Sequence, residues 1–131
     1  MKLSFIVASA IICISSLNVS GQTMGAGPMT RGGPFPFEGG KAIFDGACQA
    51  CHMAGAKGAI GAGSYPALVS DSKLAVPGYP IAVILHGQKA MPALGVYLSD
   101  RQVADVINYI RTHFGNNYSD AVKEGDVKAQ R

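Results

Sequence analysis

Two cysteines and a histidine stand together in the stretch Cys48-Gln49-Ala50-Cys51-His52. Two cysteines three apart, with histidine directly after them, form the c-type haem attachment motif. Residues i and i+3 lie on the same side of a helical turn, so both thiols can add to the two vinyl groups along one porphyrin edge. His52 then falls beneath the ring, where its imidazole can bind the iron as the proximal ligand. A proximal histidine normally donates its other ring N–H to a backbone carbonyl, and we expect Pro66 to supply that carbonyl.

Other uses of these residues fit the chain less well. A zinc site needs four ligands, and no second pair of cysteine and histidine residues completes the set. A redox-active dithiol would need a βαβ context, which the pattern of the chain lacks. The remaining cysteine, Cys13, lies in an apolar run and is interpreted as inert, so we expect no structural disulfide.

The face of the iron opposite His52 needs a second ligand, and Met91 is the best candidate. Met91 lies in the segment 87–95, between two expected helices, so its soft thioether can reach the iron from a loop. Pro92 restricts the backbone of Met91 to extended conformations, which suits such a loop. The alternative is that Met91 only fills space in the core.

Met53 and His86 are the other candidates for the second ligand. Met53 directly follows His52 and cannot reach the opposite face of the ring. His86 could replace Met91, although a histidine at the end of a helix can equally interact with the helix dipole.

Short helices must position these residues. Apolar spacing predicts a first helix over 41–51, which leads into the attachment motif. A glycine-rich loop over 55–64 allows close approach to a flat cofactor, and a short helical turn is expected over 65–68. A further helix is expected over 80–86, with Gly87 at its end.

The last helix is the clearest. Ser99 is a good N-cap, and Gln102 completes a capping box. Gly115 is expected to end the helix. Apolar residues follow one helix face, at Val103, Val106, Ile107, Ile110 and Phe114, while the outer face carries Arg101, Asp105, Asn108 and Arg111. Without any strong strand signal, we predict an all-α domain of about four or five short helices around one covalently bound haem.

Four segments are distinguished along the 131 residues. Residues 1–21 are mostly apolar, yet too short and too polar to span a membrane comfortably, and are interpreted as a secretory signal peptide. An N-terminal anchor that is not cleaved is the alternative. Residues 22–38 are expected to be a flexible Gly/Pro-rich leader. The helical domain occupies 39–115, and the polar residues 116–131 are expected to form a frayed tail.

The distribution of charged residues does not favour nucleic-acid binding. The formal net charge is +3 at pH 7, and the basic residues are scattered rather than grouped with aromatic ones. A weakly positive surface could still orient docking to an acidic partner. The acidic residues are few and unpaired, so no catalytic dyad is expected.

The chain resembles class I, single-haem cytochromes c over residues 39–115. The residues that carry the resemblance are Gly40, Phe44, Cys48, Cys51, His52, Pro66, Met91, Pro92 and Tyr109. The resemblance implies the small cytochrome c fold, in which the first and last helices cross nearly at right angles. Gly40, Phe44, Val106 and Tyr109 would then form the crossing contact.

A narrower resemblance concerns cytochrome domains that accompany periplasmic dehydrogenases. The segments 65–68, 89–93, 97–100 and 106–116 are similar to multihaem cytochrome subunits of membrane-bound quinoprotein alcohol dehydrogenases and of related aldehyde- or heteroaromatic-oxidising enzymes. This chain differs in having one haem motif and no apolar anchor after the domain. We therefore expect a soluble or small-subunit carrier, without an integral membrane span once the signal is removed.

The expected function follows from a saturated iron. A His/Met ligand pair leaves no position open for oxygen or peroxide and raises the potential, which suits outer-sphere electron transfer. We predict a periplasmic haem c protein that is not itself an enzyme. It would carry single electrons from a periplasmic dehydrogenase to another cytochrome or a terminal oxidase. The alternative is a haem enzyme or a sensor in which the methionine ligand is displaceable.

Overall fold

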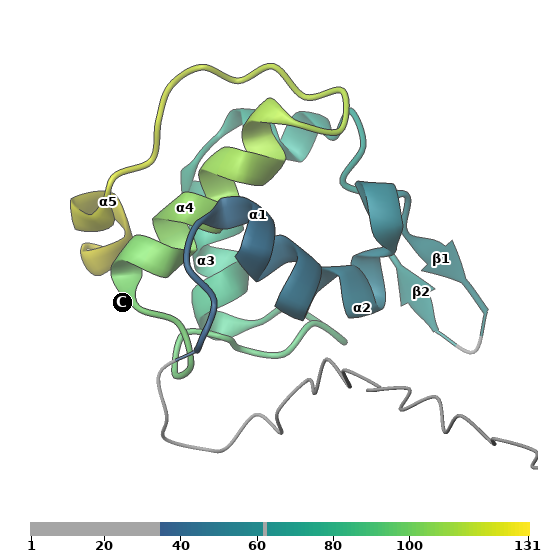
Figure 1. Ribbon diagram of the computed structural model, residues 1–131, viewed down its shortest axis with the longest axis horizontal. Coiled ribbons are helices and arrows are strands. Elements are labelled where there is room, and N and C mark those ends of the chain that lie inside the picture. The colour runs from purple at the N-terminus through teal and green to yellow at the C-terminus, as the bar shows by residue number, and fades with distance from the viewer. Residues whose placement is uncertain (1–34, 62) are drawn as a thin grey trace, which may run out of the picture.

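The computed structural model describes residues 35–61 and 63–131. The predicted signal peptide (1–21) and residues 22–34 of the predicted leader lie outside the described residues. Within the described part, the elements along the chain are α1 (Gly40–Ile43), η1 (Phe44–Cys48), α2 (Gln49–His52), η2 (Ala54–Ala56), β1 (Ala59–Ile60), β2 (Ser64–Tyr65), η3 (Ser72–Ala75), α3 (Gly78–His86), α4 (Asp100–Thr112) and α5 (Glu124–Lys128). The predicted helical class is confirmed, with one small two-stranded sheet added to it (Figure 1).

The first helical segment runs from α1 through η1 into α2, where a helix over 41–51 was predicted. Its middle, η1, is a π-helical turn rather than an α-helical one. Such turns contain an additional residue and occur frequently at functional sites. The segment ends at Met53, whose φ of 66° lies in the left-handed region. The attachment motif therefore occupies the last turn of this helical segment.

The crossing of α1 and α4 organises the fold (Figure 1). A Cβ atom on Gly40 would lie 2.2 Å from the carbonyl oxygen of Asp105 and 2.5 Å from Cβ of Tyr109, so only glycine permits this approach. The Phe44 ring lies beside the crossing, with its centroid 5.9 Å from that of Tyr109 and 4.8 Å from that of Phe114. The predicted contact between the first and last helices is therefore present.

Helix α4 begins as predicted and ends slightly earlier. The hydroxyl of Ser99 accepts from Gln102 N, and the Gln102 side chain accepts from Ser99 N, which completes the capping box. The helix ends at Thr112, before the predicted Gly115, because the backbone of His113 is already extended, with φ −121° and ψ 178°. The predicted apolar face is buried at Val103, Val106, Ile107 and Ile110.

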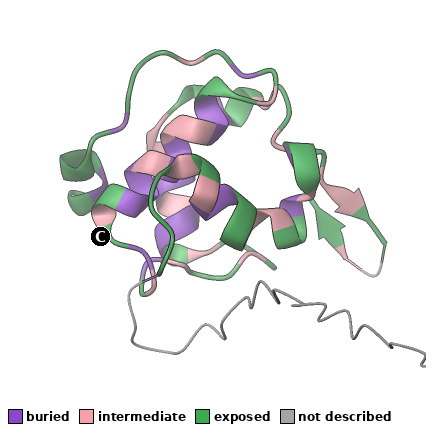
Figure 2. Ribbon diagram, viewed as in Figure 1, coloured by how far each residue is buried: buried purple, intermediate pink, exposed green. Residues whose placement is uncertain are grey.

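The buried residues concentrate on α4 and α3, and the hairpin of β1 and β2 is largely exposed (Figure 2). The antiparallel hairpin pairs Ala59 with Tyr65 and Ile60 with Ser64. The prediction of a helical turn over 65–68 was wrong. Pro66 disfavours helical backbone at Tyr65, so the chain stays extended there.

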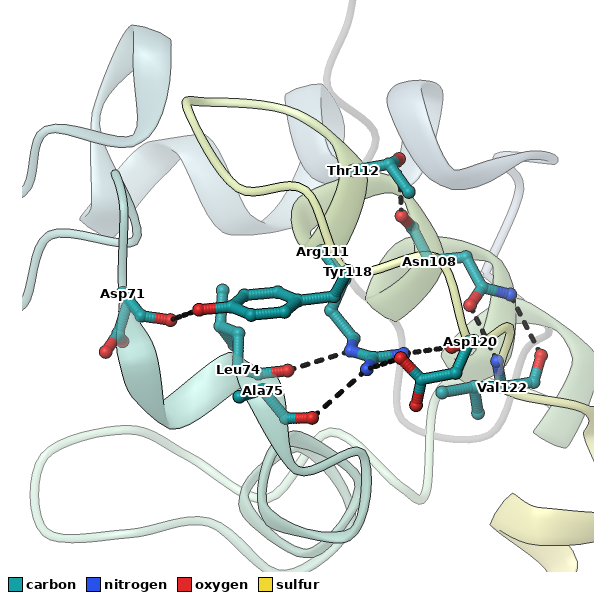
Figure 3. A network of polar contacts seen from close by, with 9 residues as sticks. All are labelled: Asp71, Leu74, Ala75, Asn108, Arg111, Thr112, Tyr118, Asp120 and Val122. Carbon is teal, nitrogen blue, oxygen red and sulfur yellow. Dashed lines mark hydrogen bonds and ion pairs between the residues drawn. The ribbon is translucent and has the colours of Figure 1, made fainter.

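The prediction of a frayed tail over 116–131 was also wrong. This segment runs back along α4 and forms α5 (Figure 1). The side chains of Val122 and Val127 are buried. As a result, Arg111 is fully buried, although the helical pattern placed it on the outer face of α4. Its guanidinium donates to carbonyl oxygens of Leu74, Ala75 and Asp120 and pairs with the Asp120 carboxylate (Figure 3).

Candidate functional site

His52 lies at the end of α2 with its side chain held in one orientation. The residue is 8% exposed, and its Nδ1 atom lies 2.9 Å from the carbonyl oxygen of Pro66. Backbone hydrogen bonds from Gly58 N to His52 O and from Leu68 N to Ala56 O fasten the loop that returns the chain to this histidine. When Nδ1 carries the proton and donates to Pro66, the unprotonated Nε2 atom is available to bind a metal.

The two cysteines of the motif are free and lie one helical turn apart. Cys48 is partly buried and packs against the core, whereas Cys51 is exposed. Burial, together with the nearby Cys51 thiol, raises the pKa of the Cys48 thiol to about 12. The Cys48 thiol is therefore protonated at neutral pH in the folded chain without haem.

This difference predicts unequal alkylation of the two thiols. In the haem-free chain at pH 8, iodoacetamide should modify Cys48 at least about tenfold more slowly than Cys51, because the thiolate is the reactive form and Cys48 is shielded. Raising the pH towards 12 should accelerate the reaction of Cys48. Peptide mass spectrometry over time measures both rates, with the chain in urea as the control. If Cys48 reacted as fast in buffer as it does in urea, its thiol would not be shielded in buffer. That result would mean that α2 does not form without haem.

Met91 lies in the loop between α3 and α4, which runs below α2 in the view of Figure 1. Paired backbone hydrogen bonds join Gln88 and Met91 at 3.0 and 2.9 Å, and Leu94 N donates to Ile84 O at 2.8 Å. Gly87 has a φ of 75°, and a Cβ there would lie 2.8 Å from the carbonyl oxygen of Met91. The loop is thus folded closely against the end of α3. The Met91 side chain is partly buried and packs against the core.

The alternative second ligand, His86, already has a hydrogen-bond partner in another part of the chain. His86 is exposed at the end of α3, and its Nε2 atom lies 2.9 Å from the carbonyl oxygen of Gln130. Met53 is adjacent to His52 at the end of α2. Met91 therefore remains the best candidate for the second ligand, in a segment distant in sequence from the attachment motif.

The donor set fits haem c. It offers two free thiols three positions apart, an imidazole with a fixed orientation and a thioether on a separate loop. Partly buried apolar side chains at Leu68 and Leu94 add the apolar environment that a porphyrin requires. Within residues 35–61 and 63–131, no group of three or more histidine, cysteine or acidic side chains could hold a metal ion directly.

Sequence reasoning missed two features that position the site. The π-helical turn η1 ends at Cys48 and sets the direction of the motif, and Gly87 allows the Met91 loop to approach α3. Gly87 was expected only to end a helix. A glycine four residues before a methionine–proline pair is the signal that could have indicated its second role.

The chain is similar to a known protein family and to curated relatives. The family model described as cytochrome c oxidase, cbb3-type, subunit III matches residues 36–110. The chain is 34% identical over 104 residues to the fructose dehydrogenase cytochrome subunit of Gluconobacter japonicus, covering 65% of this chain and 21% of that protein. It is 31% identical over 104 residues to the gluconate 2-dehydrogenase cytochrome c subunit of Pantoea cypripedii, covering 70% of this chain and 24% of that protein.

The chain thus spans about a quarter or less of these curated relatives. The family match extends over more than half of the chain and includes the attachment motif, Pro66 and Met91. Both relatives are, by name, cytochrome subunits of dehydrogenases. The chain therefore belongs to this family of c-type cytochromes, with covalently bound haem c and a role in electron transfer.

Proposed function

We propose that this protein carries single electrons in the periplasm through a haem c iron with two axial ligands, His52 and Met91. The observation that carries the proposal is the hydrogen bond between His52 Nδ1 and Pro66 O, which leaves Nε2 available for the iron. The thioether of Met91, held in a closed loop after α3, completes the pair. Haem c supplies a reversible one-electron couple at the iron.

The residues of the chain would set the properties of that couple. The Pro66 carbonyl fixes the ring of His52 and increases the basicity of its ligating nitrogen. A thioether ligand favours the ferrous state and so raises the reduction potential. With both axial positions occupied by protein, oxygen and peroxide are excluded from the iron, which favours electron transfer over catalysis.

The electron donor is proposed to be a dehydrogenase that oxidises a sugar or a sugar acid. The support is the similarity to cytochrome subunits of fructose dehydrogenase and of gluconate 2-dehydrogenase. The acceptor would be another cytochrome or a terminal oxidase. No helix among the described residues has the length and apolar character needed to cross a membrane. Export to the periplasm would follow from the predicted signal peptide at residues 1–21.

An absorption spectrum tests the ligand pair. The protein exported with haem-attachment machinery should show a sharp c-type α band when reduced, and the weak near-infrared band of ferric iron bound to methionine when oxidised. High-spin features with ready cyanide binding would contradict Met91 ligation and favour a haem enzyme or a sensor.

A reduction assay tests the donor. The ferric protein is mixed with purified fructose dehydrogenase or gluconate 2-dehydrogenase, each stripped of its own cytochrome subunit, together with its substrate. Growth of the α band should require both substrate and dehydrogenase. Reduction no faster than in the mixture without substrate, for both enzymes, would contradict the proposed class of donor.

A further inference from the structure

The segment 117–131, here called the strap, lies beyond the region matched by the family model (36–110). It leaves the end of α4, arcs over the molecule and returns beside the start of the same helix (Figure 1). The strap therefore adds contacts to the domain that the family match does not describe.

The first half of the strap is fixed to α4 and η3. The buried guanidinium of Arg111 donates to the carbonyl oxygen of Asp120, and Asn108 exchanges two hydrogen bonds with the backbone of Val122, at 2.9 and 2.8 Å. The hydroxyl of Tyr118 donates to the carbonyl oxygen of Asp71 at 3.2 Å (Figure 3). Because these contacts anchor the first half of the strap, its last residues lie at a defined position.

The far end of the strap contacts the loop that bears Met91. The guanidinium of Arg131 donates to the carbonyl oxygens of Gly95 and Leu98, four and seven residues after Met91, and pairs with Asp100 at 2.6 Å. A single side chain thus joins two points of the loop to the first residue of α4.

The strap also reaches the other side of the loop. The carbonyl oxygen of Gln130 lies 2.9 Å from Nε2 of His86, the last residue of α3. Val127, a residue of α5, is fully buried and secures this part of the strap against α4. The contacts of residues 130 and 131 therefore bracket the loop from the end of α3 to the start of α4.

We propose that the strap holds the Met91 loop closed, with Arg131 as the positioning residue that keeps the thioether on the iron. The proposal rests on the proposed role of Met91 as an axial ligand. Opening of the loop must precede the binding of an external ligand at that position. Loss of the Arg131 contacts should therefore raise the rate at which an external ligand binds, while the residues that bind the iron stay unchanged.

The test measures cyanide binding to the ferric holoprotein. Arg131→Ala should bind cyanide about tenfold faster than the unaltered protein, since hydrogen bonds from a charged group to the loop are lost. Arg131→Lys should fall between the two, because an ammonium keeps the charge but lacks the planar fork that reaches three acceptors. Lys128→Ala, an exposed change on α5, is the matched control and should stay within about twofold.

A second control separates positioning from general loss of stability. Val103→Ala removes fully buried apolar atoms from α4 and lowers the stability of the domain. It should bind cyanide less rapidly than Arg131→Ala at the same temperature. Equal acceleration in both variants would overturn the positioning role.

The two proposals fail in different ways. If the unaltered protein shows the methionine band and Arg131→Ala binds cyanide at the unaltered rate, the strap proposal is wrong and Met91 ligation stands. If the unaltered protein lacks that band, Met91 ligation is wrong and the role of the strap falls with it.

Discussion

Replacing Met91 by alanine is expected to leave the haem covalently attached through Cys48 and Cys51 while opening one face of the iron. The midpoint potential should fall by on the order of 0.1 V or more, because axial ligands set haem potentials over a range of about 0.8 V. Carbon monoxide and cyanide, which reach a saturated iron only after the methionine loop opens, should then bind readily. Redox titration and absorption spectra with and without these ligands measure both effects.

Two companion variants make this experiment specific. Met91→Leu conserves volume against the core while removing the sulfur, so it should reproduce the change in potential with little loss of packing. Met53→Ala removes the same type of side chain beside His52 and should leave the potential unchanged. A Met91→Ala protein that keeps the near-infrared band would show that another residue ligates the iron.

Replacing Gly40 by alanine is expected to cause the largest loss of stability. The added Cβ would lie 2.2 Å from the carbonyl oxygen of Asp105 and 2.5 Å from Cβ of Tyr109, so α1 and α4 would have to separate. Overpacking of this kind costs about 3 kcal/mol or more when backbone must move. For a domain of this size the Tm should fall by roughly 10–20 °C. Thermal unfolding of the holoprotein, followed by circular dichroism, measures the effect.

Gly125 offers a matched control for that substitution. It is also a helical glycine, in α5, but a Cβ there would meet nothing within 4 Å. Gly125→Ala should therefore be neutral or stabilising by up to about 1 kcal/mol, since alanine favours helix more than glycine does. Equal losses in Gly40→Ala and Gly125→Ala would exclude close helix crossing as the cause.

The features that could be predicted from sequence are those with local signals. The capping box at Ser99, the apolar face of α4 and the end of α3 at Gly87 each depend on residues within a few positions of one another. The attachment motif is local in the same sense. The contact at Gly40 is not local, and the resemblance to single-haem cytochromes supplied that expectation.

The features that were missed depend on distant parts of the chain. Val122 and Val127 are the buried apolar residues of a polar segment, too few to produce a helical period. The helical pattern places Arg111 on the outer face of an amphipathic helix. In the structure the strap covers that side of α4 and buries the residue. Neither outcome is visible in any short window of sequence. Met91 as a ligand stays a prediction that the spectrum above will test.

The π-helical turn at Phe44–Cys48 should make the first helical segment intolerant of insertions and deletions. Each residue of an α-helix advances the direction of its side chains by about 100°. Removing one residue would convert the π turn into an ordinary α turn and swing His52 away from the Pro66 carbonyl, while Gly40 stayed fixed against α4. Related chains should accordingly vary in length in their surface loops, and the number of residues between Gly40 and His52 should be constant among them.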